Sequence, residues 1–221
     1  RLCSLLCSLR PNEEKLAYSA IFEMNDKAEV KNKRIVKTVI KSDRRFTYEE
    51  AQAVIETGEG EFKDEILKLN ELAQILRTNR MAAGAVDFDR VEVRFEIDEK
   101  GKPLSVYFKE SKEANKLIEE FMLLANRTVA ECIGKVPKDK KAKVFPYRIH
   151  DLPDPDKLEN LNWFVNRFGY KIRTSGSKTE VSKSLNKLLK EVHGKKEQNL
   201  VEKVSLKAMQ KAKYSTVHIG H

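Results

Sequence analysis

The sequence predicts an α+β fold in which antiparallel β-hairpins are packed with amphipathic helices. Some stretches are rich in β-branched and aromatic residues and occur in pairs separated by turn residues, which is typical of hairpins. Longer stretches repeat apolar residues every three or four positions, which is typical of helices that cover a core. The two kinds of stretch do not alternate as they do in parallel βαβ sheets, so a mixed antiparallel arrangement is expected.

The composition is that of a globular domain with a strongly charged surface. The 221 residues are 40% hydrophobic and 35% charged, with a net charge of +9, which favours a polyanionic partner such as nucleic acid. The three cysteines lack the spacing of a metal site, and we expect Cys3 and Cys7 to be buried thiols in a reducing, cytoplasmic compartment. No apolar stretch approaches the length of a membrane span.

The first third of the chain is expected to form a hairpin and two helices. Residues 16–24 and 30–40 are its strands, and the basic residues of the second strand should face solvent. Thr47 and Glu50 have the spacing of a capping box, which predicts a short helix. A longer helix should follow from Phe62, and its apolar face comprises Ile66, Leu69, Leu72, Ala73 and Leu76.

The middle of the chain is expected to hold a second hairpin and the most regular helix. Residues 91–97 alternate apolar and polar side chains, so this strand should expose only one face, and residues 104–109 should pair with it. The helix should start after Ser111 as its N-cap and end near Gly134. Its wide apolar face comprises Ala114, Leu117, Ile118, Phe121, Met122, Ala125, Val129 and Cys132.

The last third is expected to be mainly helical. His150 follows a short strand and should be a hydrogen-bonded structural residue. Asp154 begins a helix with Pro155 at its first position, and two further amphipathic helices are expected at about 179–192 and 196–212. The first of these three helices should bury Leu158, Leu161, Phe164, Val165 and Phe168.

Two adjacent carboxylates in the middle helix, Glu119 and Glu120, differ in their surroundings because a helix turns them about 100° apart. Glu120 has leucines three or four residues away on both sides, so it lies in the more apolar environment. A buried carboxylate needs a functional purpose or a partner, which Lys116 could supply. Alternatively, Glu120 lies at the edge of the apolar face and reaches solvent. In both interpretations Glu120→Gln is expected to keep the melting temperature.

Several separate motifs give the chain a specific resemblance to one enzyme family. They are Leu6-Cys7-Ser8-Leu9-Arg10-Pro11, the run from Arg80 to Asp89 around Gly84-Ala85-Val86-Asp87-Phe88, the helical stretch from Lys116 to Asn126, the run from Tyr147 to Pro153, and the run from Ala208 to Ser215 with the closing Gly220-His221. In this order they resemble the ribonuclease II/ribonuclease R (RNB) family of processive 3′→5′ exoribonucleases, and most of all its bacterial ribonuclease R members. The resemblance covers essentially the whole chain.

The resemblance implies an enzyme that hydrolyses RNA from its single-stranded 3′ end to nucleoside 5′-monophosphates. Phe88 matches an aromatic residue that stacks on a base at the outer end of the RNA channel. Glu120 matches an active-site glutamate near the last nucleotides, and Tyr48 a tyrosine linked to the preference for ribose. Phe88 could instead be a core residue. The alternative function is a non-catalytic basic module that binds RNA or protein.

The family's metal site is matched nowhere in the chain. It is an aspartate cluster of the D-F-D-D kind that precedes the first motif, and Asp87-Phe88-Asp89 belongs to another motif. We therefore expect residues 1–221 to be a single partial catalytic domain, truncated at both ends, that binds no metal and is inactive alone. The resemblance implies that Mg²⁺ serves the parent enzyme. It also implies a monomer that acts on RNA, without a membrane or a small-molecule cofactor.

Overall fold

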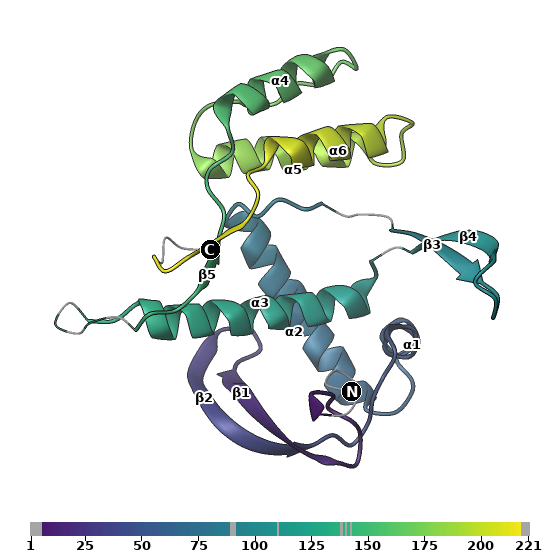
Figure 1. The fold of residues 1–221 in the computed structure, drawn as a ribbon, viewed down its shortest axis with the longest axis vertical. Helices are drawn as coiled ribbons and strands as arrows, with labels where there is room; N and C mark the ends of the chain where they lie inside the picture. Colours follow the sequence, from purple (N-terminus) through teal and green to yellow (C-terminus); the bar gives the residue numbers. More distant parts are fainter. Residues whose placement is uncertain are drawn as a thin grey trace. The chain divides into compact units, whose positions relative to one another are not determined.

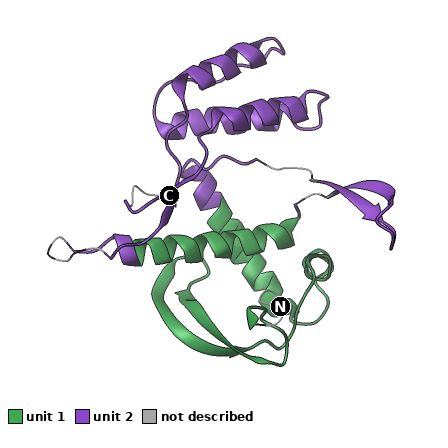
Figure 2. Ribbon diagram, in the orientation of Figure 1, with its two compact units in different colours: residues 1–77, 112–132 green, residues 78–111, 133–221 purple. Residues whose placement is uncertain are grey.

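The computed structural model describes residues 6–88, 92–109, 111–137, 139, 141 and 143–217, which contain six helices and six strands (Figure 1). The chain divides into two compact units (Figure 2). Unit 1 comprises residues 1–77 and 112–132, and unit 2 comprises residues 78–111 and 133–221. The mixture of helices with antiparallel two-stranded sheets confirms the predicted α+β class.

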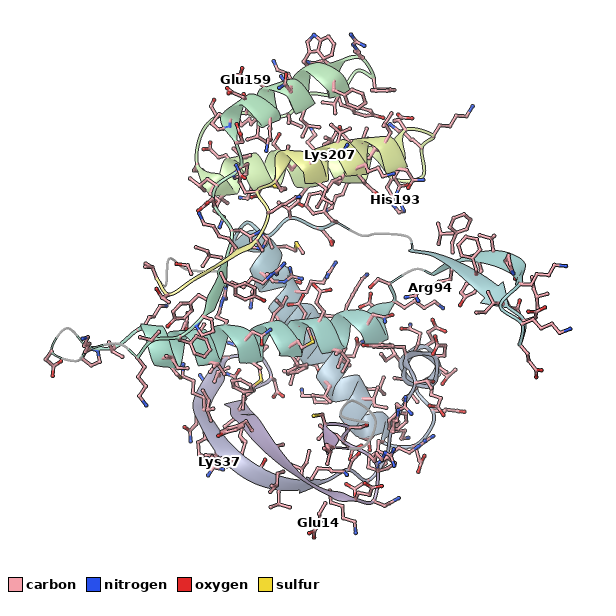
Figure 3. All side chains as sticks on the ribbon, viewed as in Figure 1. Glu14, Lys37, Arg94, Glu159, His193 and Lys207 are labelled. Atoms are coloured by element: carbon pink, nitrogen blue, oxygen red, sulfur yellow. The ribbon has the colours of Figure 1, made fainter. Side chains whose placement is uncertain are left out.

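The N-terminal hairpin of unit 1 confirms the first pair of predicted strands. β1 (Glu14–Met24) and β2 (Val30–Lys41) are antiparallel, with Ser19 opposite Val36. The half-buried positions of β1 switch from odd to even residues after Ser19, and Figure 1 shows the hairpin strongly bent. The basic residues of β2 are exposed as expected, and Figure 3 shows Lys37 on the outer side of the hairpin. They are Lys31, Lys33, Arg34, Lys37 and Lys41.

Two helices of unit 1 follow the hairpin. α1 (Tyr48–Thr57) starts at the predicted capping box and ends at Gly58, whose φ of 71° is left-handed and therefore favours glycine. α2 (Lys63–Ala82) is longer than the apolar pattern indicated and continues into the run of small residues. Leu69 was expected on its buried face but is exposed, and Asn70 is buried instead because the stripe that makes contact is turned by one residue.

α3 (Glu113–Gly134) confirms the central helix, but its buried face matches the predicted one only in part, at Ala114 and Leu117. Ile118 and Met122 are exposed, whereas Glu120 is buried. The apolar arc of the helix is wider than the surface that unit 1 covers, so the buried stripe lies to one side of that arc. Its members are Ala114, Leu117, Glu120 and Thr128.

The second hairpin is formed by β3 (Glu92–Ile97) and β4 (Pro103–Lys109), in antiparallel register with Phe95 opposite Val106. The alternation predicted these strands correctly, but it also predicted that one face would be buried. The apolar side chains of that face are all more than half exposed. Alternation shows which face of a hairpin is apolar. A two-stranded hairpin has no second layer of its own that could bury this face. The exposed side chains are Val93, Phe95, Ile97, Leu104, Val106 and Phe108.

A helical core lies in unit 2, where α6 (Gln198–Ala208) packs against α4 (Pro155–Asn166) and α5 (Lys178–Val192). Phe168 was expected in the core but is exposed beyond the end of α4. The last predicted helix ends early, because the chain after Ala208 forms β6 (Lys213–Ser215), which pairs with β5 (Tyr147–Ile149). The core residues are Leu158, Leu161, Val165, Ile172, Val181, Leu185, Leu188, Val192, Val201 and Ala208.

The cysteines differ from the expectation of buried thiols. Cys7 is exposed, and Cys132 near the end of α3 is exposed as well. Cys3 lies outside the described residues. None of the described helices combines the length and apolar character needed to cross a membrane.

Candidate functional site

The three predicted site residues lie in different units. Tyr48 and Glu120 belong to unit 1, whereas Phe88 belongs to unit 2. Tyr48 and Glu120 therefore lie on two helices of one compact unit, and the contacts around Phe88 are those of the other unit.

Glu120 is buried in unit 1 with only 3% of its surface exposed. Its carboxylate faces Arg77 of α2, with Arg77 Nη1 3.8 Å from Glu120 Oε1. The expected partner Lys116 instead pairs with Glu113, at 3.2 Å. The interpretation of Glu120 as a residue that reaches solvent is thus wrong, and the neighbouring Glu119 is the exposed one.

A buried carboxylate with a guanidinium partner has a defined chemical capacity. Burying an unpaired charge is costly, and the opposite charge of Arg77 offsets much of that cost. An ionised carboxylate only accepts hydrogen bonds, but it has about four lone-pair sites. Glu120 is therefore a hydrogen-bond acceptor held beside a cation.

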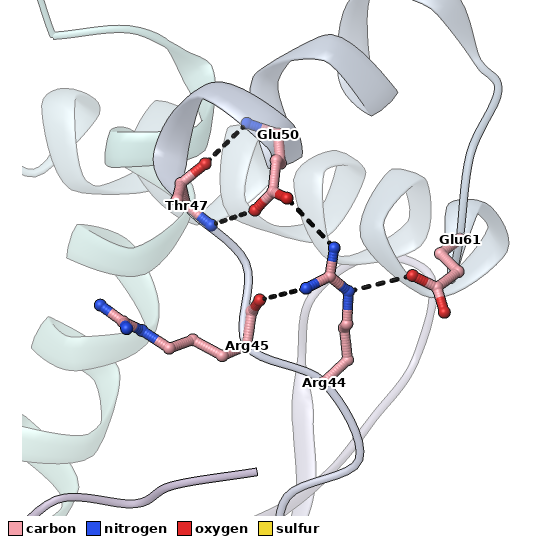
Figure 4. Close-up of polar contacts among 5 residues, drawn as sticks. All are labelled: Arg44, Arg45, Thr47, Glu50 and Glu61. Carbon is pink, nitrogen blue, oxygen red and sulfur yellow. Dashed lines mark hydrogen bonds and ion pairs between the residues drawn. The ribbon is translucent and has the colours of Figure 1, made fainter.

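Tyr48 is the first residue of α1, and its side chain is 42% exposed. The helix start that carries it is closed by the capping box. The Glu50 amide donates to Thr47 Oγ1 at 3.1 Å, and the Thr47 amide donates to Glu50 Oε2 at 2.7 Å (Figure 4). This hydrogen bond from the Thr47 amide is the main cause that lowers the pKa of Glu50. The backbone of Tyr48 is thereby fixed between two bonded residues.

Arg44 makes further hydrogen bonds around the start of α1 (Figure 4). Its guanidinium donates to Glu50 Oε1 at 3.1 Å and to Glu61 Oε2 at 3.0 Å, and it also donates to the backbone oxygen of Arg45 at 2.9 Å. The same group lies over the ring of Phe46, 4.9 Å from its centre. Arg44 thus links the segment before α1, the capping box and the segment before α2.

Gln52 joins the helix of Tyr48 to the helix of Glu120. It lies one turn after Tyr48, is 7% exposed, and its Oε1 accepts a hydrogen bond from the Ala114 amide at 2.9 Å. This bond satisfies an amide in the first turn of α3, which starts at Glu113, one residue later than a cap at Ser111 predicts. Sequence reasoning missed Gln52, since a glutamine in a helix gives no local signal of a distant partner.

Arg77 was also missed, although a signal for it exists. Ile66, Ala73 and Arg77 are separated by seven and then four residues, so Arg77 continues the buried stripe of α2. A cation on a buried stripe needs an anion on the element that packs against it. Spacing within one helix indicates only Lys116 as a partner of Glu120, because Arg77 lies on another helix.

Phe88 follows α2 in a short segment that α5 fixes by its backbone. Asn186 Nδ2 donates to the Ala85 carbonyl at 2.8 Å, and the Asp87 amide donates to Asn186 Oδ1 at 3.0 Å. Gly84, at the start of the segment, has a φ of 100° and faces the backbone of α5. Phe88 itself is half-buried. Within the described chain, Val86 packs against the helical core and Phe88 is not among the residues that do.

The described residues do not fit a magnesium site, since no group of three or more His, Cys, Asp or Glu side chains among them could hold a metal ion. His150 has a structural contact, as expected, because its Nδ1 lies 3.2 Å from the backbone oxygen of Gln210. The chemistry that these side chains offer is hydrogen bonding and stacking.

The whole chain is similar in sequence to known ribonucleases. The family model described as "RNB domain" matches residues 1–221. "Ribonuclease R" of Aquifex aeolicus is 37% identical over 228 residues, which cover 100% of this chain and 31% of that protein. "Exosome complex exonuclease RRP44" of Mus musculus is 36% identical over 181 residues, which cover 80% of this chain and 18% of that protein. The chain therefore spans less than a third of either relative.

Solved structures share the fold. Mycoplasma genitalium RNase R in complex with ribose methylated single-stranded RNA has a TM-score of 0.83 and 22% identity, covering 100% of this chain and 34% of that one. Its complex with double-stranded RNA also has a TM-score of 0.83, with 23% identity, covering 100% of this chain and 39% of that one. Yeast Ssd1, described as a pseudonuclease, has a TM-score of 0.65 and 17% identity, covering 94% of this chain and 24% of that one. Identities this low show the fold alone.

Proposed function

Because this chain belongs to the RNB domain family, we propose that it contributes RNA-contacting residues to an exoribonuclease that degrades RNA from its 3′ end to nucleoside 5′-monophosphates. The observation that carries the proposal is the match over the whole chain to relatives that are exoribonucleases. The chain spans 31% of the Aquifex protein, so the proposed activity is that of the whole protein. The proposal includes a cytoplasmic monomer that acts on single-stranded 3′ ends.

In this proposal unit 1 contacts the last nucleotides. Glu120, held beside Arg77, accepts a hydrogen bond from a ribose hydroxyl, which a deoxyribose of the same position lacks. Tyr48 is exposed at the fixed start of α1, so its ring and hydroxyl can contact the same sugar. The two side chains together favour RNA over DNA because one hydroxyl group satisfies polar atoms that would otherwise lose a partner.

Phe88 acts in the same proposal as an outer stacking platform. A base that stacks on an aromatic ring contributes about 1–3 kcal/mol and does so for any sequence. The two hydrogen bonds that join Asn186 to Ala85 and Asp87 support this role, since they fix the backbone just before the ring. Stacking far from the reacting bond holds the RNA and leaves the chemistry to other residues.

The proposed reaction is hydrolysis of the last phosphodiester bond. Water attacks the phosphorus, the bond to the 3′ oxygen of the preceding nucleotide breaks, and that oxygen takes a proton. Mg²⁺ is proposed for the parent enzyme, where it would activate the water and balance charge in the transition state. The described residues of this chain do not hold it, and their part is to bind and orient the RNA end.

A second function is favoured by one observation, which is the likeness to a pseudonuclease. The fold of this family is compatible with binding that has no catalytic outcome. A basic module that binds RNA without cleaving it is therefore the alternative.

One experiment separates the two functions. The full-length natural protein is incubated with 5′-labelled RNA that has a single-stranded 3′ end, with and without Mg²⁺, beside residues 1–221 alone. We expect successive shortening from the 3′ end with release of nucleoside 5′-monophosphates by the full-length protein only. Retention of RNA without shortening would favour the binding module, and internal cleavage would contradict the proposed direction.

A further inference from the structure

A ring of polar contacts connects α1 with the start of α3 in unit 1. Gln52 accepts from the Ala114 amide at 2.9 Å and donates from its Nε2 to Glu56 Oε1 at 3.0 Å. The same Glu56 oxygen lies 3.7 Å from Lys112 Nζ, just before α3. Gln52 is the buried side chain among these contacts and uses both ends of its amide.

The Ala114 amide needs the hydrogen bond that Gln52 supplies. The first amides of a helix have no carbonyl partner within the helix. Ala114 is buried, with 3% of its surface exposed, so solvent does not readily replace a missing acceptor. An unsatisfied buried amide is strongly unfavourable, and this holds α1 at one distance from α3.

The hydrogen bond between Gln52 and the Ala114 amide is called here the α1–α3 joint. This joint lies close to both predicted contacts with the terminal sugar. Tyr48 precedes Gln52 by four residues, which is about 6 Å along α1, and Glu120 follows Ala114 by six residues, which is about 9 Å along α3. Both distances are within two helical turns, over which a helix is stiff. A shift at the joint therefore changes the separation between Tyr48 and Glu120.

We propose that Gln52 is a positioning residue that sets the separation of Tyr48 and Glu120 and thereby the selectivity for ribose at the 3′ end of RNA. This inference rests on the proposed function. Gln52 acts through the helices and does not itself contact the RNA.

The decisive variants retain or remove the bond to Ala114 at nearly constant volume. Gln52→Leu removes both hydrogen bonds. The double variant Q52E/E56Q exchanges the roles, because a carboxylate at position 52 accepts from Ala114 and also from the new amide at position 56. The negative charge then lies near the N-terminus of α3, where a helix favours it.

Unit 2 offers a matched control. Gln198 of α6 accepts from the Gly194 amide at 2.7 Å and donates to Glu202 at 2.8 Å, so it has the same kinds of partner as Gln52. Gln198→Leu removes equivalent bonds from an element that carries none of the proposed sugar contacts.

The first measurement is amide hydrogen exchange in the full-length protein, which does not depend on activity. Exchange at Ala114 should become faster in Gln52→Leu, return toward the natural rate in Q52E/E56Q, and stay unchanged in Gln198→Leu. Unchanged exchange at Ala114 in Gln52→Leu would refute the claim that Gln52 connects α1 with α3, whatever the activity of the protein on RNA.

The second measurement is the ratio of rates at which a 3′-terminal ribonucleotide and a 3′-terminal 2′-deoxyribonucleotide are removed. We expect Gln52→Leu to lower this ratio several-fold, Q52E/E56Q to restore most of it, and Gln198→Leu to leave it unchanged. Equal loss of both rates with an unchanged ratio would show a structural role only and would overturn the proposal. If the natural protein removed neither nucleotide, the proposed function and the selectivity role would both fall, and the exchange experiment would still decide the joint.

Discussion

Neutralising Glu120 tests whether its charge matters for stability as well as for RNA. Glu120→Gln keeps the shape and some hydrogen bonding but removes the charge that faces Arg77. The sequence alone suggested that this change keeps the melting temperature. The pair with Arg77 changes that expectation, because the substitution removes one charge of an ion pair whose side chains are only 19% and 3% exposed.

The magnitude follows from the geometry. At 3.8 Å the attraction between two unit charges is about 4 kcal/mol at an effective dielectric constant of about 20. Desolvation offsets part of this attraction, and a glutamine retains a neutral hydrogen bond. We therefore expect the free energy of unfolding to fall by about 2 kcal/mol, which corresponds to a melting temperature lower by roughly 4–8 °C.

The assay is a double-mutant cycle in reversible denaturant unfolding, with Glu120→Gln, Arg77→Met and the double variant. Each single change should destabilise the protein, and the double variant should lose less than the sum of the two. Glu119→Gln is the matched control, because Glu119 is the exposed neighbour on the same helix, and it should change the free energy of unfolding by less than about 0.5 kcal/mol. Equal effects of Glu119→Gln and Glu120→Gln, or strict additivity in the cycle, would refute this account of the pair.

Three further predictions concern Phe88 and the start of α1. Phe88→Ala in the full-length protein should lengthen the final undigested product and leave the single-turnover cleavage rate nearly unchanged; an unchanged product with a much slower rate would contradict the stacking role. Asn186→Leu should reproduce the longer product, because it frees the segment before Phe88, and hydrogen exchange at Asp87 should rise; protection of Asp87 in this variant would contradict the clamp. The pKa of Glu50 is lowered in the folded protein, so the capping box stabilises α1 above the unfolded carboxyl pKa of about 4.3 and is lost as the pH falls through the lower folded value. Amide exchange at Thr47 should therefore lose its protection in acid, and an exchange that followed only the intrinsic pH dependence would refute this.

Local signals in the sequence predicted the elements well. The capping box at Thr47 and the start of α4 at Asp154 and Pro155 both depend on residues within one turn of one another. The hairpins likewise follow from alternation and adjacent turns. Such signals are complete within a short stretch, so the rest of the fold does not alter them.

Contacts between distant segments were not predictable in the same way. The Ala114–Gln52 bond spans 62 residues, and the bonds of Asn186 to the segment before Phe88 span 99 and 101 residues. The sequence pattern extended the last helix over residues 209–212 and gave no sign of β6, because the pairing partner of β6 lies far away in the sequence. The apolar pattern of α3 placed Glu120 in an apolar environment but did not reveal that the buried stripe includes it.

The central claim is that the last nucleotide of an RNA lies against α1 and α3 of unit 1, and its most direct test is site-specific crosslinking. An RNA with 4-thiouridine at its 3′ terminus is bound to the full-length protein under conditions that prevent cleavage, irradiated, and the crosslinked peptides are identified by mass spectrometry. We predict crosslinks to the peptides that carry Tyr48 and Glu120, and a shift toward the peptide of Phe88 when the probe is moved several nucleotides inward. Crosslinks of the terminal probe only to α4, α5 or α6 would contradict the claim.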